Sequence, residues 1–147
     1  MKIAIGCDPN ASDLKREVID ELTTLGHEVD DMGSDDPVYA NVVIKVGEAV
    51  AAGEYDRGVV MCGTGIGASI AANKVPGVYC ALLTDAYQAE RATLSNNANV
   101  IAMGAQVTGV KVARLLARTY MANAYVPGGR SEPKVRRITE YAEAHAK

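Results

Sequence analysis

The sequence has neither tryptophan nor phenylalanine, so its seven tyrosines supply all of its large aromatic side chains. Of its 147 residues, 48% are nevertheless hydrophobic. A core must therefore be packed from Val, Ile, Leu and Ala. The length fits one domain, which we expect to span residues 1–147.

Strong charge and long apolar runs are also missing. The net charge is only −3, so we expect no nucleic-acid partner and no attraction to an anionic membrane. No apolar run approaches the roughly 20 residues that a membrane span needs, so we expect no membrane partner. The three cysteines, Cys7, Cys62 and Cys80, are an odd number and indicate no disulfide framework. We therefore expect a cytoplasmic protein.

Histidine is scarce as well. His27 is expected between the first helix and the second strand, and His145 lies in the terminal segment. Neither histidine is placed to pair with a serine or a cysteine for acyl transfer. The spacing of Cys and His matches no metal site, so we expect no bound metal.

The order of patterns along the chain predicts the fold. Strands are expected at residues 2–6, 28–31, 59–62, 78–83 and 100–103, with a polar second strand at a sheet edge. Ser12 is expected to cap the first helix and Pro37 to open the second. Further helices are expected after residue 65 and at residues 86–94, 108–124 and 132–144. This alternation predicts an α/β fold, a doubly wound (Rossmann-like) five-stranded parallel sheet with helices on both faces.

The stretch at residues 57–74 organises the rest of the chain. A short buried strand ends at Cys62, and Gly63, Gly65 and Gly67 follow in a tight turn. A helix of small residues begins there, and its N-terminus favours anions and the thiolate form of a nearby cysteine. Ligands of such sheets bind at the carboxyl ends of the strands, where Asp8 is also expected. Cys62 is then a thiolate base for proton abstraction beside a carbonyl, or alternatively an inert buried cysteine.

A second interpretation of the glycine loop is a nucleotide-binding module. Residues 63–68 fit the dinucleotide fingerprint in its G-x-G-x-x-A form, and Asp85 follows about 20 residues later. Three facts oppose it: the loop belongs to the third strand–helix unit, Cys62 abuts the first glycine, and no chain remains for a separate substrate domain.

The last segment, residues 127–147, begins with Pro127 and two glycines and carries four basic residues within eight positions, opposed only by Glu132. A helix after such a hinge either packs on a partner subunit or presents a solvated basic face. We expect an arm directed towards a partner.

Several stretches together resemble the ribose-5-phosphate isomerase B and galactose-6-phosphate isomerase (LacAB/RpiB) family. They are residues 5–8, 62–67, 70–77, 96–100, 103–104 and 128–130, and the resemblance covers nearly the whole chain. It implies a cofactor-free aldose–ketose isomerase of sugar phosphates that works through a cis-enediolate. It also implies a homodimer, or a tetramer built from it, with an active site shared between subunits.

The resemblance assigns roles to particular residues. Cys62 matches the cysteine base, and Ala68 stands where some members use a glutamate instead, which favours Cys62. Thr64 matches the hydroxyl that assists proton transfer between oxygens. The remaining matches are to substrate-binding residues: Asp8, Tyr39, Gly63, Gly65, Ile66, Gly67, Asn96, and the phosphate-binding Arg130 and Lys134 of the neighbouring subunit's arm.

Three positions depart from the family pattern. Pro9 and Ser95 stand where histidines are usual, the second of them associated with opening of the sugar ring, and Gln106 replaces a common arginine. A four-carbon sugar phosphate forms no such ring, and residues 89–97 resemble the branch tied to tetrulose phosphates in erythritol catabolism. We therefore expect D-erythrulose 4-phosphate and D-erythrose 4-phosphate to be favoured over ribose 5-phosphate. The alternative is a non-catalytic sugar-phosphate sensor.

Overall fold

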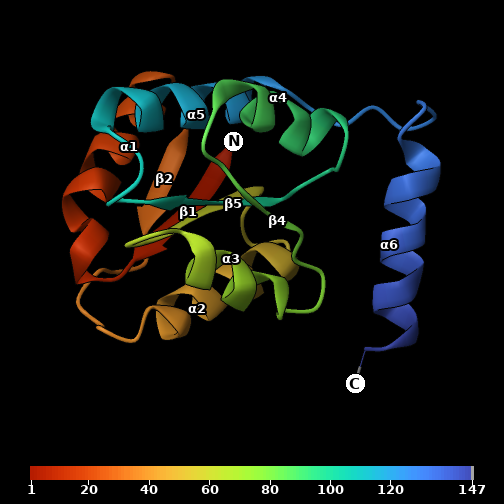
Figure 1. The fold of residues 1–147 in the computed structure, drawn as a ribbon, viewed down its shortest axis with the longest axis horizontal. Coiled ribbons are helices and arrows are strands. Elements are labelled where there is room, and N and C mark those ends of the chain that lie inside the picture. The colour runs from red at the N-terminus through yellow and green to blue at the C-terminus, as the bar shows by residue number, and fades with distance from the viewer. Residues whose placement is uncertain (147) are drawn as a thin grey trace.

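A computed structural model describes residues 1–146 and contains one five-stranded sheet (Figure 1). The strands are β1 (Lys2–Cys7), β2 (Glu28–Asp31), β3 (Arg57–Cys62), β4 (Cys80–Leu82) and β5 (Val100–Gly104). All neighbouring strands are parallel, in the order β2-β1-β3-β5-β4. The predicted doubly wound α/β fold is confirmed, and the polar β2 lies at a sheet edge as expected.

Helices cover both faces of the sheet. They are α1 (Ser12–Thr24), α2 (Tyr39–Ala51), α3 (Ile66–Asn73), α4 (Ala86–Leu94), α5 (Val110–Ala122) and α6 (Glu132–Ala144), with a short 3-10 helix, η1, at Pro9–Ala11. Figure 1 shows α1, α4 and α5 on one face and α2 and α3 on the other. The loops at the carboxyl ends of the strands therefore run between two helical layers.

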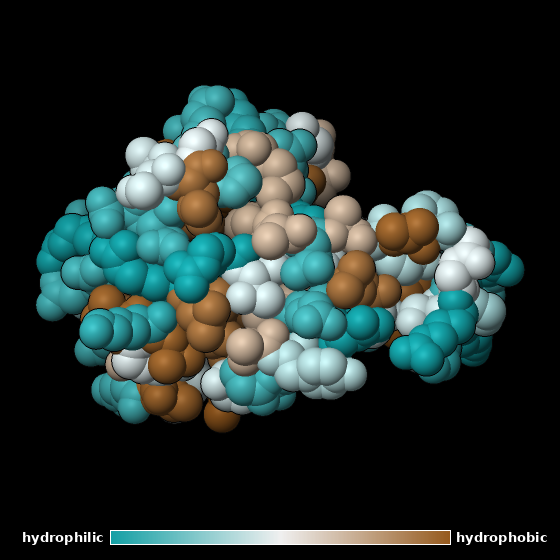
Figure 2. Space-filling view, turned by 90° about the horizontal axis from the view of Figure 1, so that it is seen from above, coloured by the Kyte–Doolittle hydropathy of each residue, from teal (hydrophilic) through white to brown (hydrophobic). Residues whose placement is uncertain are grey.

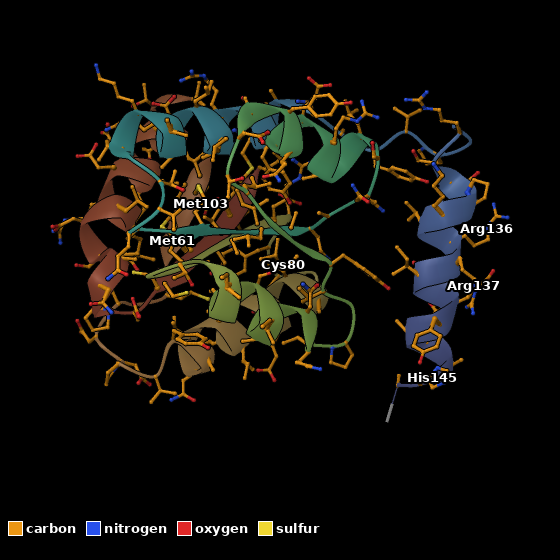
Figure 3. All side chains as sticks on the ribbon, viewed as in Figure 1. Met61, Cys80, Met103, Arg136, Arg137 and His145 are labelled. Carbon is orange, nitrogen blue, oxygen red and sulfur yellow. The ribbon has the colours of Figure 1, made fainter. Side chains whose placement is uncertain are left out.

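The alternation of side chains along each strand builds two separate cores. On β3, Val59 and Met61 pack towards α1, α4 and α5, whereas Val60 and Cys62 pack towards α2 and α3. Met61 pairs with Met103 of β5, and Figure 3 shows these two fully buried side chains in the middle of the sheet. Cys62 thus belongs to the α2–α3 side because of its position in the strand.

Four local predictions were wrong in detail. Pro37 does not open α2, which begins at Tyr39 with Val38 as its N-cap. Ser12 does not cap α1; it is the first residue of α1, because the Asp8 side chain caps η1 just ahead of it. The run at 78–83 forms a strand only at Cys80–Leu82, because the amide of Tyr79 donates to the side chain of Asn99. The fifth helix begins at Val110, after Gly109, rather than at residue 108, and it ends at Ala122 rather than at residue 124, because Asn123 is extended.

The last helix, α6, forms an arm. None of its residues is buried, and Figures 1 and 2 show it as a lobe set off from the body that holds the sheet. Figure 3 shows Arg136 and Arg137 on this helix and His145 at its end. Within residues 1–146, no helix combines the length and the apolar character that crossing a membrane requires.

Candidate active site

The site lies where the order of strands reverses. The chain continues from β1 to β2 on one side and later enters β3 on the other, so β1 and β3 flank a topological switch point. Cys7 pairs with Met61 at this position, which brings Asp8 and Cys62 to the same carboxyl edge. Ligands of open parallel sheets bind in the crevice at such a point.

The glycine loop directs one backbone donor at the Cys62 thiol. The amide of Gly65 donates to Cys62 Sγ at 3.2 Å, and the amide of Ile66 donates to Thr64 Oγ1 at 3.3 Å. Gly65 has φ 79°, a left-handed conformation that glycine adopts without strain, and α3 begins at the next residue. The sulfur therefore lies at the N-terminus of α3, where partial positive charge stabilises an anion.

The loop is pressed against the end of β5. A Cβ on Gly104 would lie 2.3 Å from the carbonyl carbon of Thr64, and one on Gly65 would lie 2.8 Å from that of Met103. Backbone bonds from Ala105 to Cys62 and from Gln106 to Gly63, at 2.9 and 2.8 Å, complete the contact. The position of Thr64 thus depends on the absence of side chains at these two glycines.

Two further predicted residues lie on the same edge. The Tyr39 hydroxyl sits 2.1 Å from where a Cβ on Gly67 would be, so this glycine admits the tyrosine ring beside the first turn of α3. Asp8 is 5% exposed, and its carboxylate accepts from the amide of Asn10 at 3.1 Å. Asp8 keeps lone pairs for a ligand while it fixes the turn after β1.

The other two cysteines have environments unsuited to anion chemistry. Burial raises the pKa of Cys7 to about 11 and that of Cys80 to about 12. Cys62 is also nearly buried, at 4% exposure, but it alone has a loop amide directed at its sulfur. The geometry therefore separates Cys62 from the other two thiols.

Asn96, Arg130 and Lys134 are not near Cys62 in the same chain. Asn96 precedes β5, whose first residue, Val100, pairs with Gly58, whereas Gly104 at its other end pairs with Cys62. Four residues of strand span roughly 13 Å, so Asn96 lies at the amino edge of the sheet. His27, beside the N-terminal amino group at 3.1 Å, is also at this amino edge.

These three residues form a second cluster among themselves. One depression, between the end of α4 and the start of α6, is lined by Ser95, Asn96, Arg130, Ser131, Lys134, Val135 and Ile138. Within residues 1–146, Arg130 and Lys134 make no ion pair, so both cations are available to an anion. The structure thus divides the predicted site residues into two groups on opposite edges of the sheet.

Some features of the site were not predicted. Asp85, a candidate ribose ligand, instead caps α4 by accepting from the amide of Gln88 at 2.9 Å. The contact of Gly104 with Thr64 depends on β5 lying next to β3, which no local pattern encodes. Arg91 was not singled out either, although its spacing of four residues from Ser95 on a helix was a usable signal.

A parallel sheet with a thiol, a glycine loop and a helix N-terminus at its switch point is the arrangement of an α/β protein suited to an anionic ligand. Comparison with known proteins makes this specific. Residues 3–138 match the family described as Ribose/Galactose Isomerase. The chain therefore belongs to the ribose/galactose isomerase family, which confirms the resemblance and the prediction of a sugar-phosphate isomerase.

Individual relatives agree over nearly the whole chain. D-erythrulose-4-phosphate isomerase of Pectobacterium atrosepticum is 42% identical over 96% of this chain and 95% of its own. Ribose-5-P isomerase B of Listeria innocua is 43% identical over 92% of this chain and 93% of its own. The structure of Clostridium thermocellum ribose-5-phosphate isomerase B superimposes with a TM-score of 0.92 at 42% identity, covering 99% of this chain and 100% of that one.

Proposed function

We propose that this protein interconverts the aldose and ketose forms of a short sugar phosphate, with Cys62 as the base. The observation that carries the proposal is the Cys62 sulfur, held at 3.2 Å by the Gly65 amide at the switch point beside Thr64. A thiolate there removes a proton from the carbon next to the carbonyl, and an enediolate forms. Cys62 then returns the proton to the neighbouring carbon, so the isomerisation involves no net oxidation and needs no cofactor.

The oxygens of the enediolate need donors and a proton carrier. The first backbone bond of α3 runs from the Ser69 amide to the Gly65 carbonyl, so the amides of Gly67 and Ala68 have no partner within the helix. Such donors, together with the helix dipole, stabilise a developing oxyanion. The Thr64 hydroxyl moves the proton between the two oxygens, while Asp8 and Tyr39 contact the sugar hydroxyls.

The phosphate is held by a second copy of the chain. Asn96, Arg130 and Lys134 lie at the opposite edge of the sheet from Cys62, so one chain cannot close the site alone. The arm has no buried residue, and Ile66 and Ile70 of α3 are 54% and 58% exposed beside the glycine loop. A homodimer in which each arm reaches the partner's crevice accounts for both features. Three free cysteines fit a reducing compartment, and we place the enzyme in the cytoplasm.

We assign the tetrose phosphates as preferred substrates. Pro9 and Ser95 cannot exchange a proton near neutral pH, so the site lacks a group to open a furanose ring. D-erythrulose 4-phosphate and D-erythrose 4-phosphate form no such ring through the phosphorylated oxygen. A 42% identical relative named D-erythrulose-4-phosphate isomerase supports the same choice.

The test is a coupled isomerase assay over four-, five- and six-carbon sugar phosphates. We expect the highest kcat/KM with the four-carbon pair. In a Ser95→His variant, the difference in kcat/KM between the four-carbon and five-carbon substrates should be smaller. Cys62→Ser should lose at least about 10³-fold in kcat, because an alcohol cannot supply the anion. A higher kcat/KM for ribose 5-phosphate would refute the substrate assignment, and near-normal turnover of Cys62→Ser would refute the base.

A further inference from the structure

The end of α4 carries an arginine that no role described above explains. Arg91 donates through Nε to the Ser95 hydroxyl at 2.6 Å, one helical turn away. The carbonyl oxygen of Arg91 also accepts from the Ser95 amide at 3.0 Å and from the Asn96 side chain at 2.9 Å. One residue therefore fixes both polar side chains that follow α4.

The two side chains lie where the arm supplies its free cations. Ser95 and Asn96 line the same depression as Arg130 and Lys134. Arg91 lines an adjoining depression that also contains Arg130 and Ser131, so it lies close to this cluster. Its only ion pair within residues 1–146 is with Glu90, at 3.5 Å. Most N–H donors of its guanidinium are therefore not taken up by a carboxylate.

The bond sets the direction in which the Ser95 hydroxyl can act. Because the Ser95 oxygen accepts from Arg91, the hydroxyl hydrogen is left to donate to another acceptor. A charged donor on one side of a hydroxyl polarises it and strengthens the bond that it donates on the other side. With Asn96 and two cations nearby, the acceptor that fits is an oxygen of a phosphate monoester.

We infer that Ser95 is a phosphate-binding residue of the arm cluster and that Arg91 is the positioning residue that aims it. The inference rests on the proposed function and adds to it a neutral donor and a third cation. The bond between the Arg91 and Ser95 side chains is not required to end α4, because the Ser95 amide already bonds to the Arg91 carbonyl. Loss of the side-chain contact is therefore expected to change ligand binding more than folding.

The experiment compares Ser95→Ala, Arg91→Met, Arg91→Lys and the double variant Arg91→Met/Ser95→Ala. The measurements are KM and kcat for D-erythrulose 4-phosphate, the dissociation constant of inorganic phosphate by calorimetry, and the thermal midpoint. Lys45→Gln, which removes one exposed charge from α2, is the matched control. Losing a charge-assisted hydrogen bond should raise KM and the phosphate dissociation constant roughly tenfold, with kcat changed far less.

Comparison of the variants shows whether Arg91 acts by orienting the Ser95 hydroxyl or only by its positive charge. The double variant should lose no more than about the larger single loss, because both changes remove one interaction. Arg91→Lys keeps the charge but not the Nε donor, so it should resemble Arg91→Met. Unchanged phosphate affinity in Ser95→Ala, additive losses, full rescue by lysine, or losses that follow a lower thermal midpoint would each overturn the inference.

Failure of the proposed function gives a different result. If the unmodified enzyme turns over no sugar phosphate, that function is refuted. Phosphate calorimetry on the same variants still tests the anion site, and a tenfold weakening there supports the Arg91–Ser95 assignment without any turnover.

Discussion

The contact between Gly104 and Thr64 allows the glycine loop to be displaced by a substitution on β5. In Gly104→Ala the new methyl group would lie 2.3 Å from the Thr64 carbonyl carbon and 2.5 Å from its oxygen, whereas ordinary contact begins near 3.4 Å. The obstacle is backbone on both sides, so no rotamer change relieves it. The glycine loop must move by roughly 1 Å away from β5, and a shift of that size at reacting groups lowers rates by about 10²-fold.

Overpacking also lowers stability, so the rate loss must be separated from unfolding. Gly104→Ala should destabilise the fold by about 1–3 kcal/mol. Gly58→Ala lies on the neighbouring strand, with its methyl group 2.9 Å from a side-chain carbon of Val46, and it should cost similar stability without touching the loop. Gly109→Ala has no atom within 4 Å of the new methyl group and controls for substitution as such.

The assay is kcat/KM with a tetrose phosphate, measured beside the free energy of unfolding in urea. We expect Gly104→Ala to lose about 10²-fold in kcat/KM and Gly58→Ala to keep nearly full activity at equal stability. If Gly104→Ala keeps its activity within threefold, or if Gly58→Ala loses as much, the placement of Thr64 by β5 does not govern the reaction.

Thiol reactivity, complementation between subunits and acid stability can each be tested as well. Iodoacetamide at pH 7 should modify Cys62 before Cys7 and Cys80, because burial raises the pKa values of the latter two to about 11 and about 12. Phosphate should slow the modification of Cys62, and mass spectrometry locates the label. In the proposed homodimer, mixing Cys62→Ser and Arg130→Ala chains should restore activity above that of either parent, because one of the two shared sites then has both residues. No recovery would place the site within one chain. Hydrogen bonds from arginines of α5 hold the pKa of Glu21 below its ordinary 4.5, so the stability it contributes is present at neutral pH and lost as the pH falls below that value. Glu21→Gln should therefore flatten the acid side of the stability profile in urea titrations.

Much of the fold could be predicted because local patterns agree with the tertiary structure. The helices at residues 86–94 and 132–144 have the predicted ends, since Asp85 caps the first and Pro133 stands at the start of the second. The first helix was misassigned at its start because two capping residues, Asp8 and Ser12, lie close together and only the packing decides between them. Propensity alone could not distinguish them.

The sequence predicted candidate residues of the site better than it predicted their positions relative to one another. The glycine pattern placed Cys62 and Thr64 at a helix N-terminus, since strand, turn and helix are consecutive in the sequence. That Asn96 lies at the other edge could have been deduced, because it precedes a strand of a parallel sheet while Cys62 ends one. The contact of Gly104 with Thr64 could not have been deduced, because the sequence does not show which strands are neighbours in the sheet.

The separation of the two clusters has an evolutionary consequence. The residues proposed to move protons and the residues proposed to bind the phosphate are attached to opposite edges of one sheet. Mutations at the end of α4 or in the arm can therefore alter the accepted chain length while the glycine loop keeps its geometry. After gene duplication, descendants of such a scaffold can diverge in substrate through changes in a few exposed residues. The glycine loop and Cys62 can stay unchanged in each descendant.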